Sequence, residues 1–134
     1  MKKNTIRIMV ICIFISLFTL KLYSQTHPAI NAYDSYLGAI GNAQKLDDLN
    51  PFISKRKIEV YSKMTPEKKI STLKFKKQIV KFTKRKSINA QTEGDNITLH
   101  VDIVDESTNN PAKVEVNVVK ENNEWKVDKE KYKF

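Results

Sequence analysis

The strict alternation of apolar and polar residues in the second half of the chain constrains its fold most. Every second residue from 97 to 103 is Ile, Leu or Val, and residues 114–118 and 125–127 repeat the pattern. Because successive side chains of a strand point to opposite faces, each segment predicts a half-buried β-strand. Residues 93–96 and 121–124 are rich in Gly, Asn, Asp and Glu and predict tight turns. The second half is therefore expected to be an antiparallel sheet with one apolar face.

The two predicted turns also fix how the strands face one another. Central turn residues Gly94 and Asp95 set the register of the first hairpin, and Asn122 and Asn123 set that of the last. A one-residue slip would move every apolar side chain to the other face, so the register is strongly specified. The expected opposing pairs are Ala90 with Leu99, Ile88 with Val101, Val118 with Val127, and Lys120 with Trp125.

The first half carries helical signals. Apolar residues recur every three or four positions from Pro28 to about residue 42, and residues 45–53 predict a second, short helix. The run Thr65-Pro66-Glu67 supplies an N-cap, a first-turn proline and an acid near the positive end of a third helix. Residues 55–63 fit either a helical turn or a short strand. The expected fold class is α+β, with N-terminal helices packed on one face of a curved antiparallel sheet of about four strands.

Residues 1–24 read as a secretory signal peptide. Three cations precede a short apolar run, and Ser24 offers a small residue at the expected cut. The alternative is an uncleaved N-terminal anchor. Cys12 lies within the apolar run without the small neighbours that a lipoprotein cleavage site needs, so the mature chain is expected to lack cysteine, disulfides and a lipid anchor. We expect residues 25–134 to form a single domain, secreted or periplasmic, with no stable membrane anchor after cleavage.

Several features together resemble the nuclear transport factor 2-like, or cystatin-like, superfamily. They are an opening amphipathic helix containing Tyr33-x-x-Tyr36-Leu37, a short second helix, a meander sheet, and the Asn-Glu-Trp-Lys-Val turn and strand at residues 123–127. Within that superfamily the chain is most similar to small exported bacterial domains of unknown function. The resemblance implies a cone-like, cystatin-like roll with a pocket between the first helix and the concave sheet face.

Catalytic chemistry has little support in the sequence. An acid–base enzyme in the cone would need a carboxylate beside a neutral donor. The candidates are Asp34 and Asp102, with His100, Tyr33 and Tyr61 as partners. Alternation directs Asp102 away from the apolar face, and Asp34 follows Tyr33 on the helix, so both are expected to be solvated. The only histidines, His27 and His100, are far apart in the chain, so neither a metal nor another cofactor is expected. We expect a protein that is not an enzyme, with the Asp/Tyr isomerase- or cyclase-like enzyme as the alternative.

The charge distribution is the most unusual property of the chain. Removing residues 1–24 leaves a net charge of +5, whereas residues 55–86 alone carry +11. Such a basic run is either a solvated surface or an anion-binding region. Alternation from residue 80 to residue 90 places Lys84 and Lys86 on the apolar face, where unpaired ammonium groups are costly. The predicted ligand-binding residues are Lys84 and Lys86 at the rim of a pocket, with walls from Tyr33, Tyr61 and Trp125.

An exported basic domain narrows the classes of partner. The leading hypothesis is a binding domain for an anionic or amphipathic small ligand, or for an envelope component or protein. A pure interaction module with a filled pocket is a further alternative. Nucleic acid is not expected in this compartment, although basic and aromatic residues alternate superficially as in single-strand binders. A homodimer through the sheet stays open, because Val104 and Val119 are its only apolar candidates on the outer face.

Overall fold

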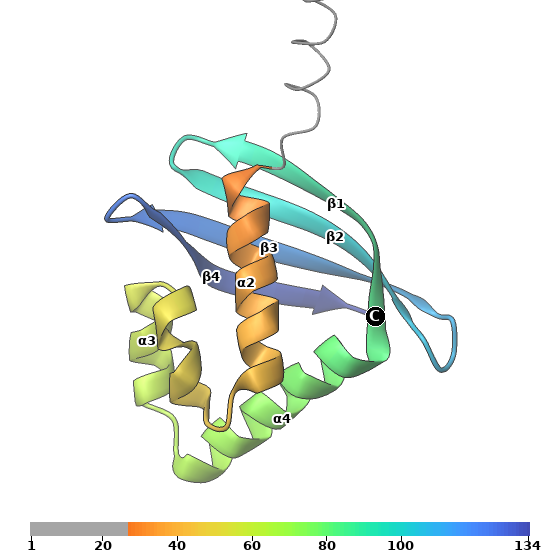
Figure 1. Cartoon of the computed structure of the whole chain (residues 1–134), viewed down its shortest axis with the longest axis horizontal. Helices are drawn as coiled ribbons and strands as arrows, with labels where there is room; N and C mark the ends of the chain where they lie inside the picture. The colour runs from red at the N-terminus through yellow and green to blue at the C-terminus, as the bar shows by residue number, and fades with distance from the viewer. Residues whose placement is uncertain (1–26) are drawn as a thin grey trace, which may run out of the picture.

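The computed structural model describes residues 27–134, which form a layer of helices on one face of a sheet (Figure 1). The predicted signal peptide lies outside the described residues. The α+β class is confirmed: helices come first and a four-stranded antiparallel sheet in the order β1-β2-β3-β4 follows. The elements are α2 (Pro28–Asn42), the 3-10 helix η1 (Leu46–Phe52), α3 (Lys55–Ser62), α4 (Pro66–Phe82), β1 (Thr83–Glu93), β2 (Asn96–Asp105), β3 (Pro111–Glu121) and β4 (Glu124–Lys133).

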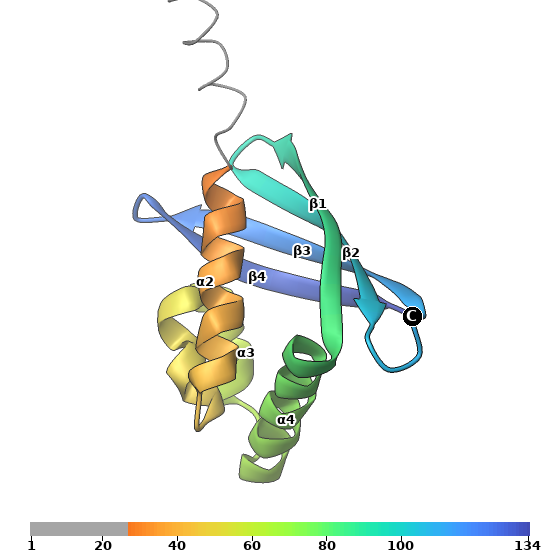
Figure 2. The ribbon, with the colours of Figure 1, turned by 45° about the vertical axis from the view of Figure 1, so that its right-hand side comes forward.

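Helix α2 runs across the concave face of the sheet, and the other helices flank it (Figures 1 and 2). His27 caps this helix, because its Nδ1 accepts a hydrogen bond from the backbone N–H of Ala29 at 3.1 Å. The ambiguous segment at residues 55–63 is helical: Ser54 caps α3 by accepting from the N–H of Lys57. Thr65 caps α4 in the same way, as the sequence predicted. These caps therefore fix the residue at which each of the three helices begins.

The predicted register of both terminal hairpins is confirmed. The four expected pairs are all observed: Ala90 with Leu99, Ile88 with Val101, Val118 with Val127, and Lys120 with Trp125. Gly94, Asn122 and Asn123 have φ values of 62°, 50° and 63°. These left-handed conformations suit Gly and Asn and match the twist of a two-residue hairpin.

The start of the first strand differs from the sequence expectation. Alternation was expected from Val80, but α4 continues to Phe82 and passes into β1 without a loop. The hydroxyl of Thr83 donates to the carbonyl of Ile79 at 2.6 Å and so closes the last turn of the helix. Val80 and Phe82 are therefore helical residues. Short apolar stretches fit both periods, so local spacing alone does not separate the two structures.

The core lies between α2 and the sheet. Its fully buried side chains include Tyr36, Ile40, Leu49, Leu99 and Val116. The carbonyl of Val127 accepts from the N–H of Ser54 at 2.9 Å, which ties the start of α3 to β4. The opposite face of the sheet is polar and carries exposed side chains such as His100 and Asp102. One face is thus covered by helices and the other meets solvent, as the alternation requires.

Candidate functional site

Two β-bulges decide which charged side chains face the helices. One lies at Lys86, between Arg85 and Ser87, and the other at Asp128, opposite the step from Asn117 to Val118. A bulge inserts one extra residue into a strand and so shifts the alternation beyond it. As a result Arg85 pairs with core-facing Ile103, and Glu130 pairs with core-facing Val116. The bulges exchange the faces that a regular strand would give these residues.

The expectation that Lys84 and Lys86 interrupt the apolar face is wrong. Lys84 pairs with Val104 on the outer face, and Lys86 is the extra residue of the bulge; both are exposed. Arg85 faces the helices instead and pairs with Asp34 of α2, with 2.9 Å between Nη1 and Oδ1. The outward placement removes the desolvation argument that had singled out the two lysines.

The three predicted aromatic residues lie on the inner side. Tyr33 and Tyr61 are each 4% exposed, and Tyr33 stacks on Tyr36 with 6.3 Å between ring centroids. Trp125 is half-buried against the edge of the core, where its ring meets that of His27 at 5.9 Å. The structure therefore does not bring these side chains together with Lys84 and Lys86.

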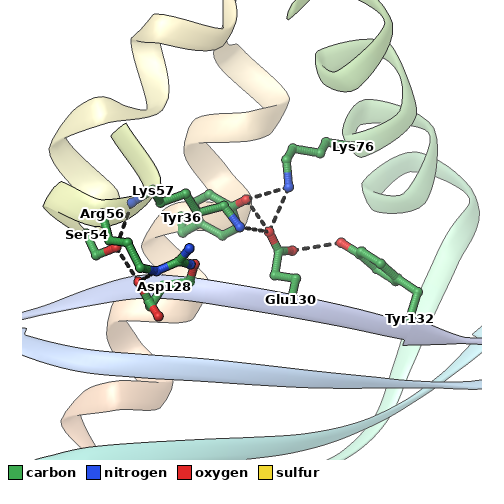
Figure 3. Close-up of polar contacts among 8 residues, drawn as sticks. All are labelled: Tyr36, Ser54, Arg56, Lys57, Lys76, Asp128, Glu130 and Tyr132. Carbon is green, nitrogen blue, oxygen red and sulfur yellow. Dashed lines mark hydrogen bonds and ion pairs between the residues drawn. The ribbon is translucent and has the colours of Figure 1, made fainter. Parts of the chain in front are cut away.

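A buried polar network, which the sequence analysis missed, lies at the centre of the helix–sheet interface (Figure 3). Lys76 of α4 donates from Nζ to Oε1 of Glu130 at 2.7 Å and to the hydroxyl of Tyr36 at 2.9 Å. The Tyr36 hydroxyl donates to the same Oε1 at 2.5 Å, and that of Tyr132 donates to Oε2 at 2.7 Å. Lys57 of α3 adds a second cation, 3.5 Å from Oε1. The network joins α2, α3 and α4 to β4.

The electrostatics of the network keep Glu130 ionised. Burial alone would raise the pKa of this carboxyl, but Lys76 and Lys57 attract the charged form and hydrogen bonds from Lys76 and Tyr36 stabilise it, which holds the pKa at about 2. Burial lowers the pKa of Lys57, whose contact with Glu130 is the longer one. Burial also opposes the charge of Lys76, but the close Glu130 carboxylate outweighs it and raises the pKa of Lys76. Burial, reinforced by Glu130, raises the pKa of Tyr36 and of Tyr132, so both hydroxyls stay protonated donors.

This network is closed to solvent. The side chains of Glu130 and Lys76 are 2% and 7% exposed. A substrate would have no access to the carboxylate, so the observed role of these residues is to join the helices to the sheet. A second group of hydrogen bonds joins the start of α3 to β4 at the bulge. The Ser54 hydroxyl donates to Oδ1 of Asp128 at 2.5 Å, and Arg56 Nε donates to the same oxygen at 2.9 Å.

An open groove runs along α4 on the side that faces η1. It has a volume of about 910 Å³ and an apolar floor that includes Leu46, Ile70 and Leu73. Five lysines line the groove around this floor. The only acid among the lining residues is Asp47, which pairs with Lys69 at 3.1 Å. The basic lining residues are Lys45, Lys69, Lys74, Lys77 and Lys81. We call this feature the α4–η1 groove.

The α4–η1 groove combines the two features that an amphipathic anion needs. Its floor can cover an apolar chain, and ammonium groups at its rim can meet a carboxylate or phosphate. Among the described residues, Lys45, Lys74, Lys77 and Lys81 form no ion pair with an acid. Their positive charge is therefore available to a ligand.

Comparison with protein-family models, with curated proteins and with solved structures finds no match. Within residues 27–134, no group of three or more His, Cys, Asp and Glu side chains is arranged to hold a metal ion. In the same part of the chain, no helix has the length and apolar character needed to cross a membrane.

Proposed function

We propose that this protein is a non-enzymatic binding domain that takes an amphipathic anion, such as a long-chain carboxylate or a single-chain phospholipid, in the α4–η1 groove. The observation that carries this proposal is an apolar groove lined by five lysines, of which only Lys69 has an acidic partner. Export would bring the domain into contact with envelope lipids. The helix layer on a meander sheet also agrees with a nuclear transport factor 2-like roll, whose cone in this chain would be filled by the buried network.

An apolar ligand fits this groove for a physical reason. Ile70 is 71% exposed and lies on the groove, where a hydrocarbon chain would remove it from water. Lysine side chains flex easily and bring their charge to the end of such a chain without being desolvated themselves. Affinity would therefore fall with ionic strength but survive in part, because the apolar contact is insensitive to salt.

The test is a titration of the purified protein with lauric acid below its micellar concentration. Binding is measured by calorimetry and by native mass spectrometry. The variant Lys74→Glu with Lys77→Glu should weaken binding by about tenfold or more, since two favourable charges become repulsive. The variant Lys129→Glu with Lys131→Glu makes the same charge change on the exposed outer face of the sheet and should bind as the wild type does.

A third variant, Lys84→Glu with Lys86→Glu, tests the site expected from the sequence. Loss of binding in this variant alone would move the site to the outer face of β1. Equal binding by all four proteins, or a wild type that does not bind, would reject the α4–η1 groove as the site.

A further inference from the structure

A row of exposed aromatic side chains lies on the other side of α4. Phe75 and Phe82 are 43% and 48% exposed, and Phe134, at the end of the chain, is 80% exposed. The three rings border one hollow of about 630 Å³, whose lining also includes Ile79 and Pro111. We call Phe75, Phe82 and Phe134 the aromatic ridge. Large aromatic groups gathered in this way on one surface mark a contact site.

A stripe of positive charge runs beside the aromatic ridge on the same helix. Lys74, Lys77 and Lys81 are spaced by three and four residues and therefore share one side of α4. Phe82 borders both the α4–η1 groove and the hollow of the ridge, so the two features adjoin. Exposed rings next to lysines on one helix are typical of helices that lie in a membrane interface.

A single acid among the residues that line the hollow opposes this positive charge. It is Asp105, whose carboxylate accepts hydrogen bonds from the Ser107 N–H and hydroxyl and from the Thr108 N–H. These bonds tie the carboxylate to its own turn. The carboxylate keeps its negative charge, but the three lysines of the adjoining stripe outnumber it, so ridge and stripe together carry a net positive charge that complements anionic headgroups.

We infer that the aromatic ridge docks on an anionic phospholipid bilayer, with Phe75, Phe82 and Phe134 among the acyl chains and the lysine stripe at the headgroups. The hollow between the rings favours a bilayer over a folded partner, because acyl chains have no fixed shape and fill such a space. The ridge adjoins the proposed ligand site and shares Phe82 with its lining, whereas Phe75 and Phe134 lie outside the α4–η1 groove. A bilayer contact there would place the α4–η1 groove beside a source of amphipathic anions.

The experiment is sedimentation of the protein, purified from its own host, with vesicles of phosphatidylglycerol and phosphatidylcholine. Binding is expected with the mixed vesicles, with a loss of at least tenfold on vesicles of phosphatidylcholine alone and a decrease as salt is raised. The variant Phe75→Ser with Phe134→Ser should lose at least tenfold in vesicle affinity. Neither residue lines the α4–η1 groove, so this variant should still bind lauric acid if the proposed function holds.

The matched control is Val60→Ser on α3, which changes an apolar side chain that is 44% exposed and lies outside both hollows. The control should bind vesicles as the wild type does. If the Phe75/Phe134 variant still binds vesicles, the inference is wrong. It is also wrong if the ridge instead joins two copies of the protein. In the latter case the wild type would be a dimer in solution, the variant a monomer, and neither would sediment with vesicles.

Discussion

Nζ of Lys76 and Oε1 of Glu130 lie 2.7 Å apart, and the two side chains are 7% and 2% exposed. This ion pair links α4 to β4 through the interior of the protein, 54 residues apart in the chain. Removing two charges from water is expensive, and the attraction between them offsets that cost only with good geometry and further hydrogen bonds. Tyr36, Tyr132 and Lys57 supply those contacts.

Removal of one member of this pair is expected to destabilise the protein strongly. Glu130→Leu leaves Lys76 buried without its counter-ion and should cost about 3–5 kcal/mol of unfolding free energy. The double variant Glu130→Leu with Lys76→Met removes both charges and should be more stable than the single variant. Urea unfolding measures both. Losses that simply add in the double variant would show that the two side chains are not coupled.

The ion pair also predicts a dependence of stability on pH. The folded-state pKa of Glu130 is lowered from 4.5 to about 2, so its contribution is complete above pH 4.5 and is lost as pH falls toward 2. A shift of this size corresponds to about 3 kcal/mol. The difference in unfolding free energy between the wild type and Glu130→Gln should therefore shrink over that interval. A difference that stays constant from pH 6 to pH 2.5 would contradict the lowered pKa.

Two neighbouring tyrosines provide a matched comparison. The Tyr36 hydroxyl donates to Glu130 and accepts from Lys76, so Tyr36→Phe should cost about 1–3 kcal/mol. The Tyr61 hydroxyl is also buried and lies near Lys76 and Tyr36, but it has no hydrogen-bond partner among the described residues. Tyr61→Phe should therefore change the unfolding free energy by less than about 0.5 kcal/mol, or increase it. Unfolding free energies from chemical denaturation measure both variants. Equal losses of unfolding free energy would contradict the different roles assigned to the two hydroxyls.

The last hairpin tests the role of its turn. Asn123 has a φ of 63°, a conformation in which a β-carbon is unfavourable and Asn is better tolerated than most residues. Asn123→Gly should preserve or raise the melting temperature, whereas Asn123→Ala should cost about 1 kcal/mol. Thermal unfolding by circular dichroism measures both. A more stable Ala variant would mean that the turn adopts another conformation.

Much of the fold follows from local sequence. Alternation and turn residues predicted the hairpin register down to pairs such as Val118 with Val127, and Thr65 with Pro66 predicted the start of α4. The charged residues Asp102 and His100 lie on the exposed face as expected. These features depend on neighbours within a few positions, or on a two-residue turn that aligns its own strands.

The buried polar network around Glu130 was less predictable from the sequence. Glu130 lies in a run of Lys, Glu and Tyr that reads as a solvated strand end, and regular alternation from Val127 would turn it outward. One available signal was the tyrosine at position 132, which shares a face with Glu130 and favours burial. In α4, Lys76 faces inward, because the helix packs at an angle that its weakly amphipathic sequence does not fix.

The sequence by itself determined the helix caps, the two hairpins and the apolar face of the sheet, because each is set by interactions between near neighbours. The tertiary structure decided where β1 and β4 bulge, and therefore that Lys84 and Lys86 lie outside while Glu130 lies inside. The position of a bulge depends on what two strands and the helices over them can pack together. A charge enters the interior only where distant partners meet it, and Lys57 and Lys76 meet Glu130 only after the helices have docked on the sheet.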